Sequence, residues 1–206
     1  MEKGENNTLN KNLVKKSIFD AFLELLTVAK YEEITVNEIV ENSYVSRVTF
    51  YNYFKNKDAL LNELLDQFLE TFNELLKGDQ GLLERMNISK KKDAYQALYP
   101  YTYKILDYFY CNKKLVLAFY GMDHEKLDFI KILQKNYHDH FVQALPQRFY
   151  QSVEGARIEY YSLFITNGVI SIVEKWFAMS FEENIGDVVD RILVLLITNL
   201  SALYSE

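Results

Sequence analysis

One short stretch, residues 44–61, constrains the fold of this chain more than any other. Its sequence, YVSRVTFYNYFKNKDALL, predicts the end of a tight turn, a short helix, a break and the start of a long helix. The short helix would begin at Ser46, because a serine hydroxyl can cap free backbone N–H groups. Val45, Phe50 and Phe54 would anchor it to a small core, while most of its other residues carry hydrogen-bonding groups.

A second helix is predicted immediately upstream. Thr35 and Glu38 have the spacing of a capping box, in which each side chain accepts from the backbone N–H of the other residue. The box opens a helix with apolar residues on one side, and this helix would end near Ser43. A turn of about three residues then separates the two helices, as a helix-turn-helix requires. In such units the second helix enters the DNA major groove.

The order of these elements resembles the DNA-binding domain of the TetR/AcrR family of transcriptional regulators. The resemblance covers residues 10–65, and it is carried by the capping threonine, by EIV at 38–40, and by TFYNYF followed by KDALL. One position departs, because Tyr44 stands in the turn where most members have glycine. A tyrosine held at positive φ would cost on the order of 1 kcal/mol or more, so this turn is either shaped differently or strained.

The resemblance implies an all-α fold in two parts. An N-terminal three-helix DNA-binding domain with the helix-turn-helix would span residues 1–56, and a larger helical domain for effector binding and dimerisation would span 57–206. It also implies a homodimer that binds double-stranded DNA and responds to a small-molecule effector of unknown identity.

Eight side chains in and around the two helices are candidates for DNA contact. They are Thr35, Ser46, Arg47, Thr49, Tyr51, Asn52, Tyr53 and Lys57. Arg47 can offer a two-pronged hydrogen bond to guanine, the commonest specific base contact, although a phosphate contact is the alternative. By resemblance, the two tyrosines contact phosphates. Lys57 would hold a phosphate together with the free N–H groups at the start of the fourth helix.

Charge and composition narrow the function classes. The net charge is −6 in 206 residues, and residues 1–60 carry 8 basic and 9 acidic side chains. Residues 44–57 nevertheless contain three basic side chains and no acidic one, so cations are grouped where DNA contact is predicted. The single cysteine excludes an internal disulfide. No signal sequence or membrane-spanning stretch is apparent, so we expect a cytoplasmic protein.

The sequence shows no catalytic or metal-binding constellation, and we expect neither an enzyme nor a cofactor. His138 and His140 are two residues apart, so they would point to different faces of a helix and could not easily share a metal ion. No Ser/His/Asp set, glycine-rich phosphate loop or pair of carboxylates stands out.

Helical periodicity extends over most of the chain. Residues 1–9 are expected to be disordered, and the first helix is expected at about 10–29. Beyond the helix-turn-helix, helices are expected at about 57–78, 82–86, 89–111, 113–120, 125–145, 155–179 and 185–203.

Sixteen tyrosines and fourteen phenylalanines are unusually many for a chain of this length. They could form plain core, or some could line a cavity for an apolar or aromatic effector. The candidates are Tyr99, Tyr103, Phe119, Tyr120, Tyr137, Phe141, Tyr161 and Trp176.

The last two predicted helices carry apolar residues on more than one side, which favours a second covering surface outside their own domain. Two copies could pair these helices in a four-helix bundle. The interface candidates are Ile172, Ile185, Val189, Ile192, Leu196 and Leu200.

Two hypotheses follow. The first is a ligand-responsive homodimeric regulator, a repressor, that binds a pseudo-palindromic operator. The second is a TetR-like coactivator that acts through protein–protein interaction, of the type linked to dihydroxyacetone kinase control. The small number of basic side chains in the predicted DNA-binding domain and the tyrosine at position 44 favour the second hypothesis.

Overall fold

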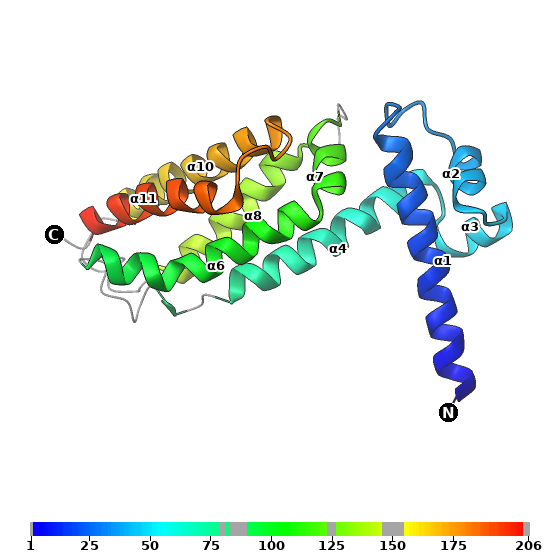
Figure 1. Ribbon diagram of the computed structural model, residues 1–206, viewed down its shortest axis with the longest axis horizontal. Coiled ribbons are helices and arrows are strands. Elements are labelled where there is room, and N and C mark those ends of the chain that lie inside the picture. The colour runs from blue at the N-terminus through cyan, green and yellow to red at the C-terminus, as the bar shows by residue number, and fades with distance from the viewer. Residues whose placement is uncertain (1, 79–80, 83–89, 123–126, 146–154, 204–206) are drawn as a thin grey trace. The chain divides into compact units, whose positions relative to one another are not determined.

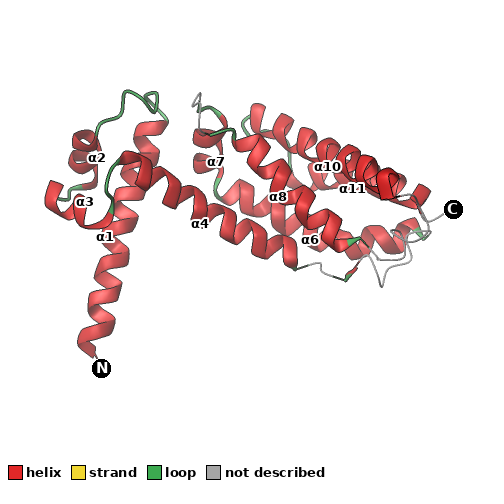
Figure 2. Cartoon of the chain, turned by 180° about the vertical axis from the view of Figure 1, so that it is seen from behind, coloured by secondary structure: helices red, strands yellow, loops and turns green. Residues whose placement is uncertain are grey.

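The computed structural model describes residues 2–78, 81–82, 90–122, 127–145 and 155–203. In these ranges the chain forms nine α-helices and no β-strand (Figures 1 and 2). The predicted all-α fold is therefore confirmed. The short helix predicted at 82–86 lies almost wholly outside the described residues.

The chain divides into two compact units. The first comprises Met1–Glu70 with the segment Gly121–Glu125, and the second comprises Thr71–Tyr120 with Lys126–Glu206. Helix α4 (Lys57–Lys77) contributes to both units, because the division falls after Glu70. The predicted boundary at residue 56 lies immediately before the start of this helix.

The first unit contains α1 (Glu2–Leu26), α2 (Val36–Ser43), α3 (Arg47–Tyr53) and the first part of α4. Each helix contributes fully buried apolar side chains to one core, which includes Ile18, Phe22, Ile39, Phe50, Phe54 and Leu60. Phe54 packs at 5.7 Å, between ring centroids, from both Phe19 and Phe50. This core fixes α3 by its apolar side and leaves the opposite side exposed.

Helix α1 begins at Glu2, so the prediction of disorder over residues 1–9 is wrong for the residues described. A polar segment continues a helix easily once the next turns are formed, since each added residue gains one backbone hydrogen bond. The helix ends at Leu26, and the Thr27 hydroxyl donates to the Glu24 carbonyl at 2.7 Å.

The second unit contains the end of α4 and five further described helices. These are α6 (Lys91–Cys111), α7 (Lys113–Tyr120), α8 (Phe129–Ala144), α10 (Gly155–Ala178) and α11 (Ile185–Leu203). Helix α11 packs against α6 and α10, and α10 also packs against α8. Helix α8 begins four residues later than predicted because Asp128 caps it, accepting from the Lys131 N–H at 3.0 Å.

Much of the aromatic content forms the core of the second unit. Phe177 lies 5.4 Å from Phe109 and 5.2 Å from Phe181 between ring centroids, and Phe181 lies 4.6 Å from Trp176. All four side chains are 5% exposed or less. Each large ring buries more apolar surface than an aliphatic side chain, so a few rings stabilise the junction of α6, α10 and the turn after α10.

No helix in the described ranges is long and apolar enough to span a membrane. Within the same ranges, no group of three or more His, Cys, Asp or Glu side chains is arranged to hold a metal ion.

Candidate functional site

The start of α2 is fixed by the predicted capping box. The Glu38 N–H donates to the Thr35 hydroxyl at 3.3 Å, and the Thr35 N–H donates to the Glu38 carboxylate at 2.7 Å. The bond from the Thr35 backbone lowers the pKa of Glu38, because it stabilises the ionised carboxylate. Thr35 is exposed, but its hydroxyl is used within this box.

The turn between α2 and α3 is strained at Tyr44. This residue has φ 55° and ψ 31°, which is the left-handed region that favours glycine. Its N–H bonds to the Glu41 carbonyl, and the next N–H, of Val45, bonds to the Val40 carbonyl. These are the bonds of a standard helix C-terminus, so the turn keeps its usual shape and tyrosine adopts the strained conformation. Tyr44 is 96% exposed.

Ser46 caps α3 as predicted. Its hydroxyl accepts from the Thr49 N–H at 3.0 Å and lies 2.8 Å from the Thr49 hydroxyl. Both oxygens therefore lie together at the start of α3, where the first backbone N–H groups have no partner within the helix.

The outward side of α3 is polar and exposed. Arg47, Tyr51 and Asn52 are all exposed, whereas Phe50 is fully buried. Tyr53 is half-buried, with its ring 6.3 Å from that of Phe54. The structure thus brings most of the predicted DNA-contacting side chains to one small surface, formed by α3 and the N-terminus of α2.

The two helices are joined by a side-chain contact. The Arg47 guanidinium donates to the side-chain oxygen of Asn37, which lies in the first turn of α2. Because Asn37 and Arg47 are both exposed, the guanidinium is held near α2 while its other N–H groups remain accessible.

Lys57 is used inside the first unit to a greater extent than predicted. Its ammonium donates to the carbonyl of Tyr31 and, at 2.7 Å, to that of Ile34, and it lies 4.1 Å from the centre of the Tyr31 ring. Burial lowers the pKa of Lys57. The Tyr31 hydroxyl in turn donates to the Asp58 carboxylate. Burial and that bond raise the pKa of Tyr31. These contacts fasten the segment before α2 to the first turn of α4.

Sequence reasoning missed Val48. This valine lies on α3 and is 71% exposed, on the side away from Phe50. Its four-residue spacing from Asn52 places the two side chains on one helical face, and this spacing could have identified it from the sequence. Val48 is an apolar residue in the middle of an otherwise polar surface.

Two family models match the chain. The model described as bacterial regulatory proteins, tetR family, matches residues 18–64. The model described as transcriptional regulator C-terminal region, of the TetR type, matches residues 96–198, which is half of the chain. The chain belongs to the TetR family. It is therefore a DNA-binding transcriptional regulator and not an enzyme.

Two curated relatives are similar over part of the chain. The HTH-type dhaKLM operon transcriptional activator DhaS of Lactococcus lactis subsp. lactis (strain IL1403) is 35% identical over 63 residues, which are 30% of this chain and 34% of DhaS. YvkB of Bacillus subtilis (strain 168), an uncharacterized HTH-type transcriptional regulator, is 36% identical over 66 residues, 32% of this chain and 35% of YvkB. The match thus spans about a third of the length of these relatives.

A solved structure extends the likeness of fold. The structure of a dihydroxyacetone kinase operon activator DhaS matches with a TM-score of 0.62 over 92% of this chain and 97% of that chain. The sequences are 18% identical in this comparison, so the match shows that the two proteins share a fold.

In this TetR-family chain the eight aromatic effector candidates do not surround one cavity. Tyr137 lines an internal cavity of about 60 Å³. Tyr99 lines an open groove between α6 and α11, and Trp176 lines another between α10 and α11. Phe119 and Phe141 are buried.

The other three aromatic candidates have identifiable packing or hydrogen-bonding roles. Tyr103 is 39% exposed and stacks on Tyr99, with 6.0 Å between ring centroids. Tyr120 packs against Phe177 at 6.2 Å, and the Tyr161 hydroxyl donates to the Asn199 carbonyl at 2.8 Å.

The internal cavity lies among α4, α6, α8, α10 and α11 of the second unit. Its lining is apolar except for three residues with hydroxyl groups, Tyr101, Thr102 and Tyr137. Two of these three come from α6, where the sequence had pointed to Tyr99 and Tyr103 as candidates. Such an apolar enclosure with a few hydroxyls is suited to a small apolar ligand with one polar group.

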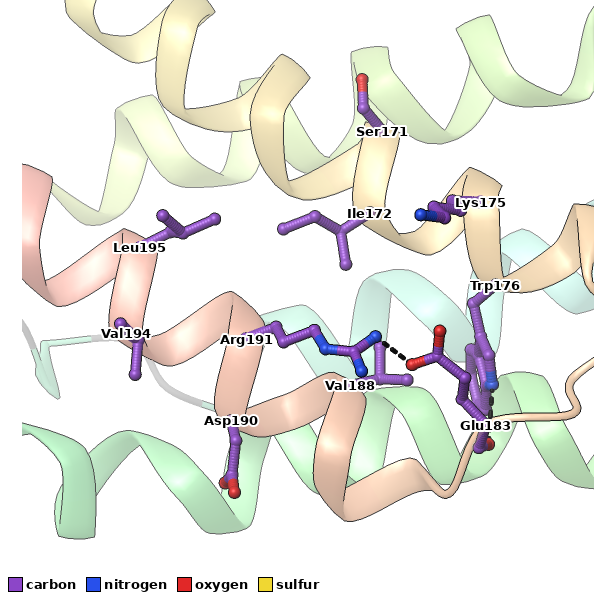
Figure 3. A pocket seen from close by; sticks show the side chains of 10 residues that line it. All are labelled: Ser171, Ile172, Lys175, Trp176, Glu183, Val188, Asp190, Arg191, Val194 and Leu195. Atoms are coloured by element: carbon purple, nitrogen blue, oxygen red, sulfur yellow. Dashed lines mark hydrogen bonds and ion pairs between the residues drawn. The ribbon is translucent and has the colours of Figure 1, made fainter.

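A larger groove of about 550 Å³ lies between α10 and α11. Figure 3 shows Ile172 and Leu195 pointing toward one another across it, with the Arg191–Glu183 ion pair at one end. The Trp176 indole N–H donates to the Glu183 carbonyl at 3.0 Å, which fixes the turn between the two helices.

The predicted dimer-interface residues need correction. Val189, Ile192, Leu196 and Leu200 are 8% exposed or less within the single chain. Helices of their own unit cover most of their surface, so they offer little area to a second chain. Ile172 and Ile185 are half-buried. The exposed apolar residues of these helices are different ones, namely Tyr160, Leu163 and Phe164 on α10 and Val194 and Leu195 on α11.

Proposed function

We propose that this chain is a homodimeric, ligand-responsive repressor that binds a pseudo-palindromic operator in the cytoplasm. The observation that carries the proposal is the outward surface of α3, which is preformed, exposed and free of acidic side chains. Each subunit would place α3 in a major groove, with the two grooves about one helical turn apart.

Within each half-site some side chains would contact bases and others would contact phosphates, according to their chemistry. Arg47 reads a guanine, and Asn52 reads an adjacent base edge, because both side chains are exposed and can form two parallel hydrogen bonds. Thr35, Ser46, Thr49, Tyr51 and Tyr53 contact phosphates at the borders of the surface. Lys57 contributes its remaining N–H and the positive end of α4 to a nearby phosphate.

The homodimer would form through the outer faces of α10 and α11. Phe164, Val194 and Leu195 are 65%, 59% and 53% exposed, and large exposed apolar side chains on neighbouring helices favour a protein contact. Antiparallel pairing of these helices with those of a second copy gives a closed, two-fold symmetric assembly.

The effector would bind in the cavity among α4, α6, α8, α10 and α11. A cavity of about 60 Å³ holds only a few atoms, so a larger ligand must displace the lining helices. Helix α4 lines this cavity with Phe72 and Leu76, and its first part belongs to the core of the first unit. A ligand that displaces α4 would therefore also move the first unit, and this movement is the proposed cause of release from DNA.

DNA binding is tested by selection from random duplexes with the purified full-length protein. We expect enrichment of an inverted repeat, and loss of its binding by at least tenfold in Arg47→Ala. Lys104→Ala is the matched control, because Lys104 is an exposed cation of the second unit. Enrichment of no motif, or equal affinities for wild type and Arg47→Ala, would refute the proposal.

A coactivator that acts by binding another protein is the second candidate. The similarity to DhaS, described as a transcriptional activator, and the net charge of −1 in residues 1–60 favour it. Weak nonspecific DNA binding is expected from this charge, since phosphate neutralisation supplies most of that affinity. The coactivator is supported if the selection enriches no motif while the protein still dimerises. In addition, the Arg47→Ala variant should restore regulation in cells that lack the wild-type protein.

A further inference from the structure

We infer that Val48 reads the methyl group of a thymine and thereby specifies a T·A pair in each half of the operator. This inference rests on the proposed function, because it assigns a specificity to one more side chain of the same DNA-binding surface. The observation behind it is the 71% exposure of an aliphatic side chain on α3.

Val48 does not stabilise the fold by packing. The buried side of α3 consists of Phe50 and of Phe54 just beyond its end, at 0% and 1% exposure. At 100° per residue, Val48 lies well away from both rings, and Asn52 is its neighbour on the next turn. A valine in this position leaves most of its surface in water, so the folded chain gains little from it.

The chemistry of valine restricts what it can read. In the major groove each base pair presents hydrogen-bonding groups, and thymine alone adds a methyl group. Valine cannot form hydrogen bonds, so contact with the amino group of cytosine would leave that donor without water or partner. Contact with a thymine methyl removes apolar surface from water on both sides.

The neighbours of Val48 are consistent with this reading. Asn52 can bond adenine through two parallel hydrogen bonds, and Arg47 can bond guanine. Val48 lies between them in the outward face, one residue after Arg47 and one turn before Asn52. A half-site read by these three residues would contain a guanine, a thymine methyl and an adenine in close succession.

The test removes the methyl group from DNA. Each thymine of the selected operator is replaced in turn by deoxyuridine, symmetrically in both halves, and the Kd of the full-length dimer is measured. We expect one position at which the loss is about fourfold per half-site, the effect of withdrawing one methylene-sized group from an apolar contact. In Val48→Ala, deoxyuridine at that position should change Kd by less than about twofold.

Two further variants sharpen the result. Replacing the thymine by cytosine should weaken binding, and 5-methylcytosine should recover part of the affinity, because it restores the methyl group alone. Val28→Ala is the matched control, because Val28 is another exposed valine of the first unit, 81% exposed and outside α3. It should keep the full response to deoxyuridine.

The outcomes separate this inference from the proposed function. If an operator is enriched but no thymine responds to loss of its methyl group, the inference about Val48 is wrong and the operator-binding function stands. The same conclusion follows if Val48→Ala retains the response. If selection enriches no operator, the proposed function and this inference fall together.

Discussion

The guanidinium of Arg47 donates a hydrogen bond to the side-chain oxygen of Asn37, and this contact joins the two helices of the helix-turn-helix. An exposed hydrogen bond contributes only about 0.5–1.5 kcal/mol, so DNA can replace it with little loss. The contact nevertheless restricts Arg47 to a small region beside α2 before DNA binds.

Replacement of Arg47 by lysine should separate base reading from charge. Lysine keeps the positive charge but lacks the two-pronged donor, so we expect discrimination at one G·C pair to fall by about 1–3 kcal/mol. The dependence of affinity on salt should be unchanged, since the number of neutralised phosphates is unchanged. Competition binding with each G·C pair exchanged in turn measures the effect.

Asn37→Ala serves as the control for this experiment, because it removes the anchor and leaves the guanidinium intact. We expect it to change operator affinity by less than Arg47→Lys does. A uniform loss on all sequences in Arg47→Lys would show instead that Arg47 contacts phosphate.

Replacement of Tyr44 by glycine should stabilise the protein. The left-handed conformation costs a residue with a Cβ atom about 1–2 kcal/mol, and glycine gives back about 0.4–1 kcal/mol through its freer unfolded state. The net gain should be about 0.5–1 kcal/mol in the free energy of unfolding. Tyr44→Ala keeps the strain and shortens a residue that is 96% exposed, so it should have little effect. Equal stabilities of the two variants in urea unfolding would argue against strain in this turn.

The capping box should make stability depend on pH through Glu38. Its pKa is lowered in the folded state, so its contribution is present above the ordinary value near 4.5 and is lost as the pH falls through the lowered value. Glu38→Gln keeps the geometry of the box and cannot titrate. We expect wild type to lose more stability than Glu38→Gln as the pH falls from about 5 to about 3.

Urea unfolding at a series of pH values compares the two proteins directly. If the free energy of unfolding falls equally in both proteins over this range, the ionised Glu38 carboxylate is not better stabilised in the folded state than in the unfolded one.

A charge on the outer face of α11 should prevent dimerisation. Leu195 is 53% exposed, so glutamate is accommodated in the free subunit but would place a charge in the apolar interface of a dimer. We expect Leu195→Glu to sediment as a folded monomer with the helical circular dichroism of wild type. Val28→Glu adds the same charge to the first unit and should leave the assembly unchanged. A dimeric Leu195→Glu would show that another face forms the interface.

The bounds of some helices could be predicted closely from the sequence. The bounds expected for 113–120 and 185–203 agree with those of α7 and α11. The two caps of the helix-turn-helix, at Thr35 and Ser46, were also predicted correctly, because their hydrogen bonds join residues only three apart. Local chemistry is sufficient for such features.

The surface that covers each stripe could not be predicted. Val189 and Leu195 both belong to the broad apolar stripe predicted for α11, yet the first is fully buried in the subunit and the second is 53% exposed. Periodicity identifies apolar faces but does not show which neighbouring helix covers them. The effector candidates do not surround one cavity, and the sequence could not divide them for a related reason: an aromatic residue in a core and one beside a cavity have the same sequence pattern.

The contacts of Lys57 and Asp58 with the segment around Tyr31 have a kinetic consequence. Since these contacts form within the protein and do not require a DNA phosphate, the first unit should be folded before it binds DNA. Encounter with an operator would then be limited by diffusion and orientation, and the described helix-turn-helix would not have to become ordered on the way.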